Sequence, residues 1–247
     1  MPLFTDGIVS AIEDLRAQET HIYNLASAEG IDLTMKLHLG QQEVAIELTR
    51  IVQRTGSVTG ALDGVVVTPP LKLWHVFHTL SIVYRDAYFN QLNDRYQSKW
   101  KEYRSLATWA QEMLVQTGLG VVSAPLARAN APTLGSAPGV GAPDMYFVQY
   151  AWTNAAGQEG MPGGVSCLAT GSGYALTVLP GVPPQTATGW NVYAGTSIDS
   201  LTRQNSSPLP LSVPWTMPPI GLISGQKPGT GQEPDALKIV PRVQLRG

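Results

Sequence analysis

The clearest fold signal in the chain is the stretch T-G-W-N-V-Y-A-G-T-S-I-D-S-L-T-R-Q-N-S-S-P-L-P, residues 188–210. Polar and apolar residues alternate over 191–194, which predicts a half-buried β-strand. Gly195 and the small polar residues after it predict a turn, and residues 201–205 predict a short returning strand. Trp190 and Tyr193 are large enough to anchor a small sandwich core, and each carries a polar group that needs a hydrogen-bond partner.

Similar short strands precede this stretch. Residues 145–152 form the strongest strand pattern, and Asn154 to Gly157 supply its turn. Residues 165–169 and 174–179 are predicted to pair as a hairpin around a Gly-Ser-Gly turn. Short strands at about ten-residue spacing, each followed by a turn signal, predict a β-sandwich.

The first half of the chain has helical rather than strand periodicity. Apolar spacing predicts one helix from Thr5 to about Ala28, with Thr5 or Asp6 as its cap and Gly30 just after its end, and a second helix that Asp32 caps. Gly40 lies inside the second helix and is expected to weaken it by roughly 1 kcal/mol relative to Ala. Together with two later helices, these segments predict an antiparallel helical bundle.

The third and fourth helices carry most of the aromatic residues of the bundle. Thr68-Pro69 is a strong start signal for the third, and Asn93-Asp94 lies where the third would end and the fourth begin. Periodicity alone leaves open whether they are two helices or one long rod. The third helix is apolar over most of its circumference, which indicates that several neighbouring helices or another subunit cover it.

Proline divides the chain into two parts, with three prolines before Gly118 and sixteen after it. The predicted fold class is therefore α+β and multidomain. A helical bundle (1–118) is followed by a linker (119–131), a small all-β sandwich (132–215) and an extended C-terminal tail (216–247). The end of the tail is too apolar for a free segment, which favours docking on a partner.

Charge, cysteine content and hydropathy exclude several classes. The net charge of −2 gives no general attraction to nucleic acid or membranes. The single cysteine, Cys167, excludes an internal disulfide, and we expect it to be a buried small hydrophobe in a strand. No basic region followed by an apolar run marks a signal peptide, and no window predicts a membrane span.

No stretch of the sequence has the spacing of an active site. His75 and His78 are three residues apart on the third helix, but the Glu-x-x-His pairs of a bundle metal site do not accompany them. Glu43 and Glu47 share a helix face without such a companion, so the histidines are interpreted as structural. We therefore expect no enzyme activity, no catalytic residue, no cofactor and no metal.

The run from Arg95 to Arg104 interleaves basic and aromatic residues, a pattern also found where proteins stack on single-stranded nucleic acid. Helical spacing instead places its aromatic residues on a core face and its bases on a solvated face. Lys99 and Lys101 are then the candidates for contact with acidic groups of a partner or with DNA.

Several motifs resemble a known class of virion protein. G-W-N-V-Y-A-G-T (189–196), W-T-N-A-A-G-Q-E-G (152–160) and P-G-T-G-Q-E-P-D (228–235) are similar to the immunoglobulin or fibronectin-III-like domain of tailed-phage proteins. A-E-G-I-D-L-T-M-K-L (28–37) and T-P-P-L-K-L-W-H (68–75) resemble the helical module of head–tail adaptors, the neck proteins that dock under the portal.

This resemblance implies a structural virion protein made in the host cytoplasm and located at the head–tail junction. It implies a closed homo-oligomeric ring of about 12 copies with heterologous interfaces. The ring's partners would be the portal protein and the downstream tail or nozzle proteins, with passive contact to DNA in the channel and no membrane. The interface residues then expected are Lys99, Lys101, Ile239, Arg242, Val243 and Arg246.

A different function class is a phage surface module that recognises host glycans. β-Sandwiches with exposed aromatic residues often bind sugars, and Trp152, Trp190 and Trp215 would form the platform. Strand positions favour burial of Trp152 and Trp190, which counts against this alternative.

Overall fold

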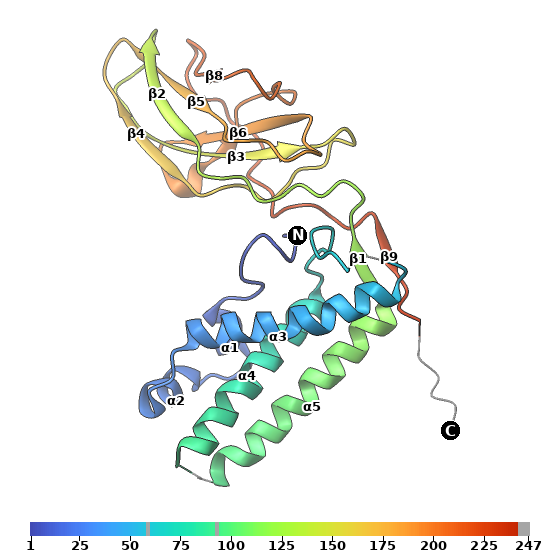
Figure 1. Cartoon of the computed structure of the whole chain (residues 1–247). Helices are drawn as coiled ribbons and strands as arrows, with labels where there is room; N and C mark the ends of the chain where they lie inside the picture. Colours follow the sequence, from blue (N-terminus) through green and yellow to red (C-terminus); the bar gives the residue numbers. More distant parts are fainter. Residues whose placement is uncertain (58–59, 92–93, 242–247) are drawn as a thin grey trace. The chain divides into compact units, whose positions relative to one another are not determined.

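The computed structural model describes residues 1–57, 60–91 and 94–241 (Figure 1). The chain forms two compact units. The helical unit comprises Gly7–Val122 and Pro234–Gly247, and the β unit comprises Met1–Asp6 and Ser123–Glu233. The α+β class, helices first and antiparallel sheets after, is confirmed.

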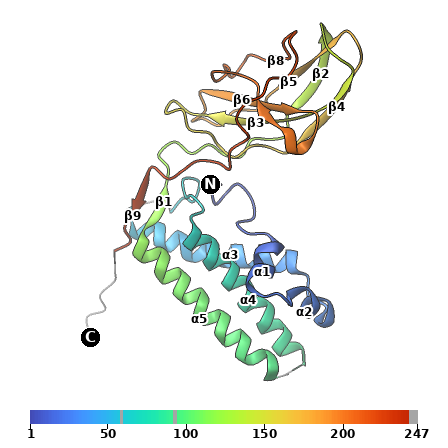
Figure 2. The same cartoon turned by 180° about the vertical axis from the view of Figure 1, so that it is seen from behind.

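The described part of the helical unit contains five α-helices (Figures 1 and 2). Their bounds are α1 (Ile12–Gln18), α2 (Ile22–Glu29), α3 (Leu33–Arg54), α4 (Pro69–Gln91) and α5 (Asp94–Thr117). Two of the predicted boundaries are confirmed: Asp32 caps α3, because its Oδ1 accepts hydrogen bonds from the backbone N–H of Thr34 (2.8 Å) and Met35 (3.2 Å). Gly30 ends α2 with a φ of 65°.

The prediction of a single first helix over 5–28 is wrong. Glu19 leaves the helical conformation with φ −137° and ψ 95°, so α1 and α2 are separate. This break places the Glu19 carboxylate 2.9 Å from the Tyr103 hydroxyl, which donates a hydrogen bond to it. Asp6 does not cap a helix either, since its carboxylate accepts from the backbone N–H of Leu3 and of Arg128, all three in the β unit.

Helices α4 and α5 are separate and lie side by side as an antiparallel hairpin (Figures 1 and 2). Aromatic rings join them: the Tyr103 ring stacks on Phe77 and Tyr84, with centroids 6.4 and 5.5 Å apart. The wide apolar surface predicted for α4 is covered by α1, α2, α3 and α5 of the same chain. Burial of α4 therefore requires no second subunit.

At Gly40, α3 approaches α4 closely. A Cβ at this position would lie 2.4 Å from Thr79 Oγ1, far inside van der Waals contact. Thr79 is fully buried, and its hydroxyl oxygen has no hydrogen-bond partner in the described structure. Glycine has a low helix propensity, but a larger residue at this position would push the two helices apart. Close packing of α3 on α4 therefore requires glycine here.

Gly40→Ala is expected to lower the free energy of unfolding by about 1–3 kcal/mol, because overpacking outweighs the better helix propensity of alanine. Adding Thr79→Ala removes the clashing hydroxyl, so the double variant is expected to recover most of the loss. Urea unfolding of the two single variants and the double variant measures this coupling. A Gly40→Ala protein as stable as the parent would contradict the close-approach explanation.

Part of the predicted linker is a strand. β1 (Leu119–Val121) pairs antiparallel with β9 (Ala236–Lys238), so Val121 lies opposite Ala236. On the other side of β1, the Val66 N–H donates to the Gly120 carbonyl at 3.0 Å. The linker prediction for 119–131 is therefore wrong at its start, because residues 119–121 pair with β9 and Leu119 is fully buried.

The β unit contains two antiparallel sheets. One has the order β2 (Thr133–Pro138), β5 (Tyr174–Leu179), β8 (Trp215–Thr216). The other has the order β4 (Ser166–Thr170), β3 (Asp144–Thr153), β6 (Gly189–Gly195), β7 (Thr202–Arg203). Their inner faces share one core that includes Tyr150, Trp152, Leu176, Val178 and Trp190.

The predicted hairpin of 165–169 with 174–179 is wrong. β4 pairs with β3, whereas β5 pairs with β2 and β8, so the two segments belong to different sheets. The turn between them bends from one sheet to the other: Gly173 has a φ of 82°, and the Tyr174 N–H donates to the Gly171 carbonyl. A Gly-Ser-Gly turn can join two strands of one sheet or two strands of different sheets. The packing of the core determines which of these connections forms.

The expectation of a half-buried strand at 191–194 is also corrected, because all seven residues of β6 are buried. Loops cover the second face of the strand, where Tyr193 packs with Ala151 and Leu201. The polar groups on this face have partners: the Tyr193 hydroxyl donates to Glu159 at 2.6 Å. On the core side, Trp190 Nε1 donates to the Pro210 carbonyl at 3.1 Å.

The predicted boundary at Trp215 is too early. Met217 and Gln232 are buried, and the Gln232 amide bonds to Leu126 N and the Ala124 carbonyl within the β unit. Ile223 N likewise donates to Gln204 Oε1 at 2.9 Å. Residues 216–233 are extended but pack on their own unit, because side-chain amides replace the backbone ladder of a regular sheet.

Candidate functional site

One candidate site is a groove of about 450 Å³ between α3, α4 and α5 of the helical unit. Each helix contributes one face. The lining residues are Glu43, Val44 and Glu47 of α3; Trp74, His78, Ser81, Ile82 and Arg85 of α4; and Trp100, Arg104, Ala107, Thr108 and Gln111 of α5. Spacings of three and four residues in each helix place these side chains along one stripe.

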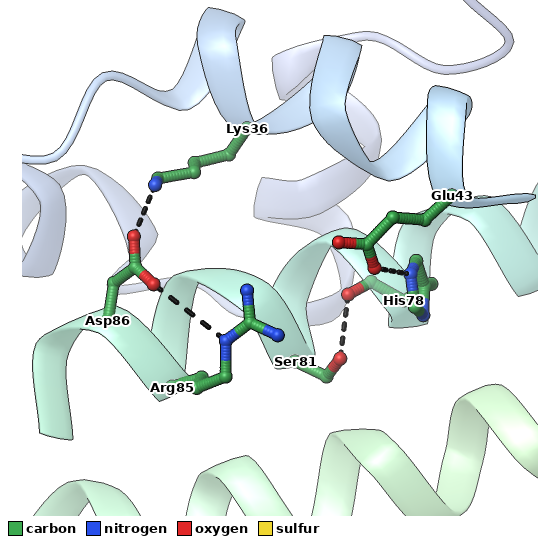
Figure 3. Close-up of polar contacts among 6 residues, drawn as sticks. All are labelled: Lys36, Glu43, His78, Ser81, Arg85 and Asp86. Carbon is green, nitrogen blue, oxygen red and sulfur yellow. Dashed lines mark hydrogen bonds and ion pairs between the residues drawn. The ribbon is translucent and has the colours of Figure 1, made fainter. Parts of the chain in front are cut away.

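Figure 3 shows polar contacts of α3 and α4, and four of the residues drawn in it also line the groove: Glu43, His78, Ser81 and Arg85. Glu43 on α3 accepts from His78 Nε2 on α4 at 2.7 Å. Lys36 on α3 forms an ion pair with Asp86 on α4, and Arg85 Nε is 3.9 Å from the same carboxylate. Two cations therefore share one acid, and these contacts tie α3 to α4.

Glu43, His78 and Ser81 include the residue types of a hydrolase triad, but their geometry differs from one. The Ser81 hydroxyl donates to the backbone carbonyl oxygen of its own helix neighbour His78 at 2.7 Å (Figure 3). A nucleophilic serine must instead give its proton to the imidazole ring. These contacts are those of helix packing, and they supply no activated nucleophile.

His75 is enclosed in the helical core. Its Nε2 donates to the Leu37 carbonyl at 3.0 Å, and its Nδ1 accepts from the Ser10 hydroxyl at 2.6 Å. Both ring nitrogens are thus used inside the protein, as expected for a structural histidine. Burial lowers the pKa of His75 from 6.5 to about 4.

Lys99 and Lys101, the two predicted interface bases, have different surroundings. Lys99 lies 3.5 Å from Glu19 and 3.4 Å from Glu102, so it joins α5 to the α1–α2 junction. Burial disfavours the charge on Glu19, but hydrogen bonds from Tyr103 and Tyr84 and the nearby Lys99 charge outweigh it and lower the pKa of Glu19. Lys101 is exposed on α5 and is the freer of the two for a partner.

The predicted interface residues of the tail fall into two sets. Ile239 is 79% exposed, directly after β9, while the neighbouring Val240 is only 2% exposed and anchors the segment. Arg54 Nη2 donates to the carbonyl oxygen of Pro241. Arg242, Val243 and Arg246 lie outside the described residues. Up to Pro241 the tail packs on its own chain, and its docking on a partner stays a prediction, for which Ile239 is an exposed side chain.

The tryptophans of the predicted glycan platform are buried. Trp152, Trp190 and Trp215 are 2%, 0% and 7% exposed, so none of them presents a ring face to a sugar. This platform is therefore wrong. The prediction that Cys167 is buried is also wrong. The residue is exposed, because it lies on the outer face of β4, opposite the side that faces the core.

Sequence reasoning missed the polar network of the β unit. Glu159 accepts from Asn191 Nδ2 as well as from Tyr193, and Arg203 Nη2 donates to Asn191 Oδ1 at 2.9 Å. Burial, followed by the bond to Glu159, raises the pKa of Tyr193. The signal for this network is polar Asn191 in an otherwise apolar strand, but its partners come from distant loops.

Within residues 1–57, 60–91 and 94–241, no group of three or more histidine, cysteine or acidic side chains is placed to hold a metal ion. None of the helices in the same ranges has the length and apolar character that a membrane crossing requires.

Comparison with known proteins gives no assignment: no family model, curated protein or solved structure matches this chain. Its function must therefore be argued from its own residues.

The pKa of His75 predicts how stability depends on pH. The unfolded chain binds this proton near pH 6.5 and the folded one near pH 4, so stability is lost as the pH falls through that window. Its contribution is about 3 kcal/mol between pH 7 and pH 4. Urea unfolding across this range is expected to show a shallower pH dependence for His75→Gln than for the parent. Equal slopes for the two proteins would contradict this assignment.

Proposed function

We propose that this protein is a structural subunit of the head–tail connector of a tailed phage. Copies of the chain form a ring beneath the portal and join the capsid to the tail around the DNA channel. The sequence resemblance supports this proposal, as does the combination of a helical unit with a β-sandwich unit. The protein's place is then the neck of the virion, and its work is docking rather than chemistry.

Exposed apolar residues on two different helices are the observation that carries the proposal. Met35 and Ile46 are 67% and 59% exposed, and their spacing of three helical turns puts both on the outer face of α3. Trp109 is 48% exposed on the outer face of α5. A closed head-to-tail ring needs two different patches on each copy, one for each neighbour.

The remaining partners are assigned by charge and exposure. Lys101 is the base for acidic groups of the portal or for phosphates in the channel, since Lys99 already has two acidic neighbours. Ile239, beside β9, is the apolar contact toward the portal or a neighbouring copy. The glycan alternative no longer has the tryptophan platform on which it depended, so the connector is the function we retain.

Lysine substitutions test the ring through complementation. Ile46→Lys and Trp109→Lys are each expected to prevent ring assembly with little change in melting temperature, because both residues are exposed. Mixed together, the two variants retain one intact interface between an α3 patch and an α5 patch, so they are expected to form heterodimers but no rings. Mass photometry measures the oligomers.

Val182→Lys is the matched control, because it places the same charge at an exposed apolar position of the β unit. This variant is expected to assemble as the parent does. Rings of unchanged size in both helical variants would contradict the proposal, because Ile46 and Trp109 would then lie outside the contacts between copies.

Copy number tests the location. Quantitative mass spectrometry of purified particles is expected to give a one-to-one ratio of this protein to the portal protein. A clear excess or a ratio of one half would place it in the capsid, tail or fibres instead. Absence from the particle would contradict a virion role altogether.

A further inference from the structure

A pocket of about 400 Å³ in the β unit is built from polar groups. The loop after β3, the strand β7 and the extended segment 226–233 all contribute to it. Its lining residues are Gly157, Gln158, Glu159, Arg203, Gln226, Gly229, Gly231, Gln232 and Glu233. Pockets for small molecules have a similar volume but are lined mainly by apolar and aromatic side chains. None of the described residues that line this pocket has an apolar side chain, which favours a hydrophilic ligand.

Two side chains of opposite charge in this lining, Glu159 and Arg203, are held by the same buried amide. Asn191 is 1% exposed; its Nδ2 donates to Glu159 Oε1, and its Oδ1 accepts from Arg203 Nη2 at 2.9 Å. The Tyr193 hydroxyl donates to the second carboxylate oxygen of Glu159 at 2.6 Å. Buried side chains of β6 therefore fix both charged groups before any ligand binds, and such preorganisation lowers the cost of binding.

Neither charge has an ionic partner in the described part of the chain. Glu159 accepts hydrogen bonds from a neutral amide and a neutral phenol, and the Arg203 guanidinium donates to a neutral amide oxygen. Arg203 Nε is buried and has no hydrogen-bond partner among the described residues. Both side chains are half-buried, where water compensates a charge less well than at the surface. A ligand that carries an ammonium group and a carboxylate supplies a partner for each of them.

The gap between the two charges suits a short zwitterion. The nitrogen and oxygen of the Asn191 amide are about 2.3 Å apart. With one hydrogen bond on each side of this amide, Glu159 Oε1 and Arg203 Nη2 are at most about 8 Å apart. In an α-amino acid the ammonium nitrogen lies about 3 Å from the carboxylate oxygens. A charge-assisted hydrogen bond of about 2.8 Å at each end extends the reach of such a ligand to about the same length.

Gly229 leaves the space beside Glu159 open. Apart from its own chain neighbours, a Cβ on this residue would have no heavy atom within 4 Å except Glu159 Oε2, at 3.8 Å. The φ of Gly229 lies outside the left-handed region, so a side chain would cause no backbone strain. A larger residue at this position would instead occupy the pocket next to the carboxylate.

We propose that this pocket binds a free α-amino acid with a small polar side chain. The ammonium group of the ligand donates to Glu159, and its carboxylate accepts from the guanidinium of Arg203. The amides of Gln158 and Gln226 are in the same lining and suit the polar side chain of the ligand. This proposal does not depend on the connector function, because it concerns one pocket within the β unit of a single copy.

Ligand analogues test the site on the unmodified full-length protein. Calorimetry and ligand-observed NMR with L-serine and L-glutamine are expected to show saturable binding to one site. Glycerate lacks the ammonium group, serine methyl ester lacks the carboxylate, and γ-aminobutyrate separates the two charges too widely. Each of these three is expected to bind at least tenfold more weakly than L-serine. No binding of either amino acid, or equal binding of glycerate, would overturn the proposal, as would binding of glucose in place of the amino acids.

Filling the pocket tests its location. Gly229→Leu is expected to abolish binding with little change in melting temperature. Gly171→Leu is the matched control, because a Cβ there is also unhindered, with Tyr174 Cδ2 as its nearest contact at 3.9 Å, and this turn is not part of the pocket lining. The control is expected to bind as the parent does. Unchanged binding in Gly229→Leu, or equal loss in both variants, would overturn the assignment to this pocket.

Neutral substitutions test the two charges separately. Glu159→Gln and Arg203→Gln are each expected to weaken binding of L-serine at least tenfold, because each removes one of the two ionic partners. Glu159→Gln is also expected to reduce the preference for L-serine over glycerate, since the ammonium group then has no carboxylate to meet. A structural role alone would weaken both ligands equally, and that outcome would contradict the contact between the ammonium group and Glu159.

Discussion

The helical unit depends on the burial of α4. This helix is covered by four other helices of the same chain, and its residues His75, Thr79 and Leu80 have no exposed surface. Such a helix can be approached closely only where the neighbouring backbone lacks a side chain, which explains Gly40 on α3. The polar groups that α4 cannot avoid burying either find internal partners, as His75 does, or remain without one, as Thr79 Oγ1 does.

The same burial explains why the residues proposed for contacts with other molecules lie on the outer surfaces. The inner faces of α3 and α5 are used to cover α4, so contacts with other molecules fall to the opposite faces and to the groove between the helices. Ile46 and Trp109 lie on these outer faces, while the Glu43–His78 pair borders the groove and ties it to α4. Packing and the proposed docking therefore use different sides of the same helices.

The sequence predicted α3, α4 and the order of α and β parts well because their signals are local. Asp32 and Thr68-Pro69 mark helix starts within a few residues, and periodicity identifies the buried faces. It failed where distant residues decide the outcome. Glu19, at the break between α1 and α2, accepts a hydrogen bond from Tyr103, which is far away along the chain, and the sheet that β5 joins shares its core with the other sheet.

For the candidate site too, local features could be predicted from the sequence and long-range contacts could not. The stripes of α3, α4 and α5 are visible in the sequence, but which stripes face one another follows from how the helices pack. Lys99 looks like a solvated base in the sequence, and only the fold brings Glu19 to it. The tail was expected to dock on a partner because its end is too apolar for a free segment; β1 and Arg54, which it contacts in its own chain, are more than a hundred residues away.

The pairing of β1 with β9 has a consequence for the architecture as a whole. Residues 123–233 begin and end beside this two-stranded ladder, in which Val121 is directly opposite Ala236. Opposed residues of an antiparallel pair are only about 5 Å apart, a gap that a tight turn closes. Most of the β unit is therefore an insertion in a helical protein. It is a cassette that evolution or an engineer can lengthen, exchange or delete without cutting through the helical core.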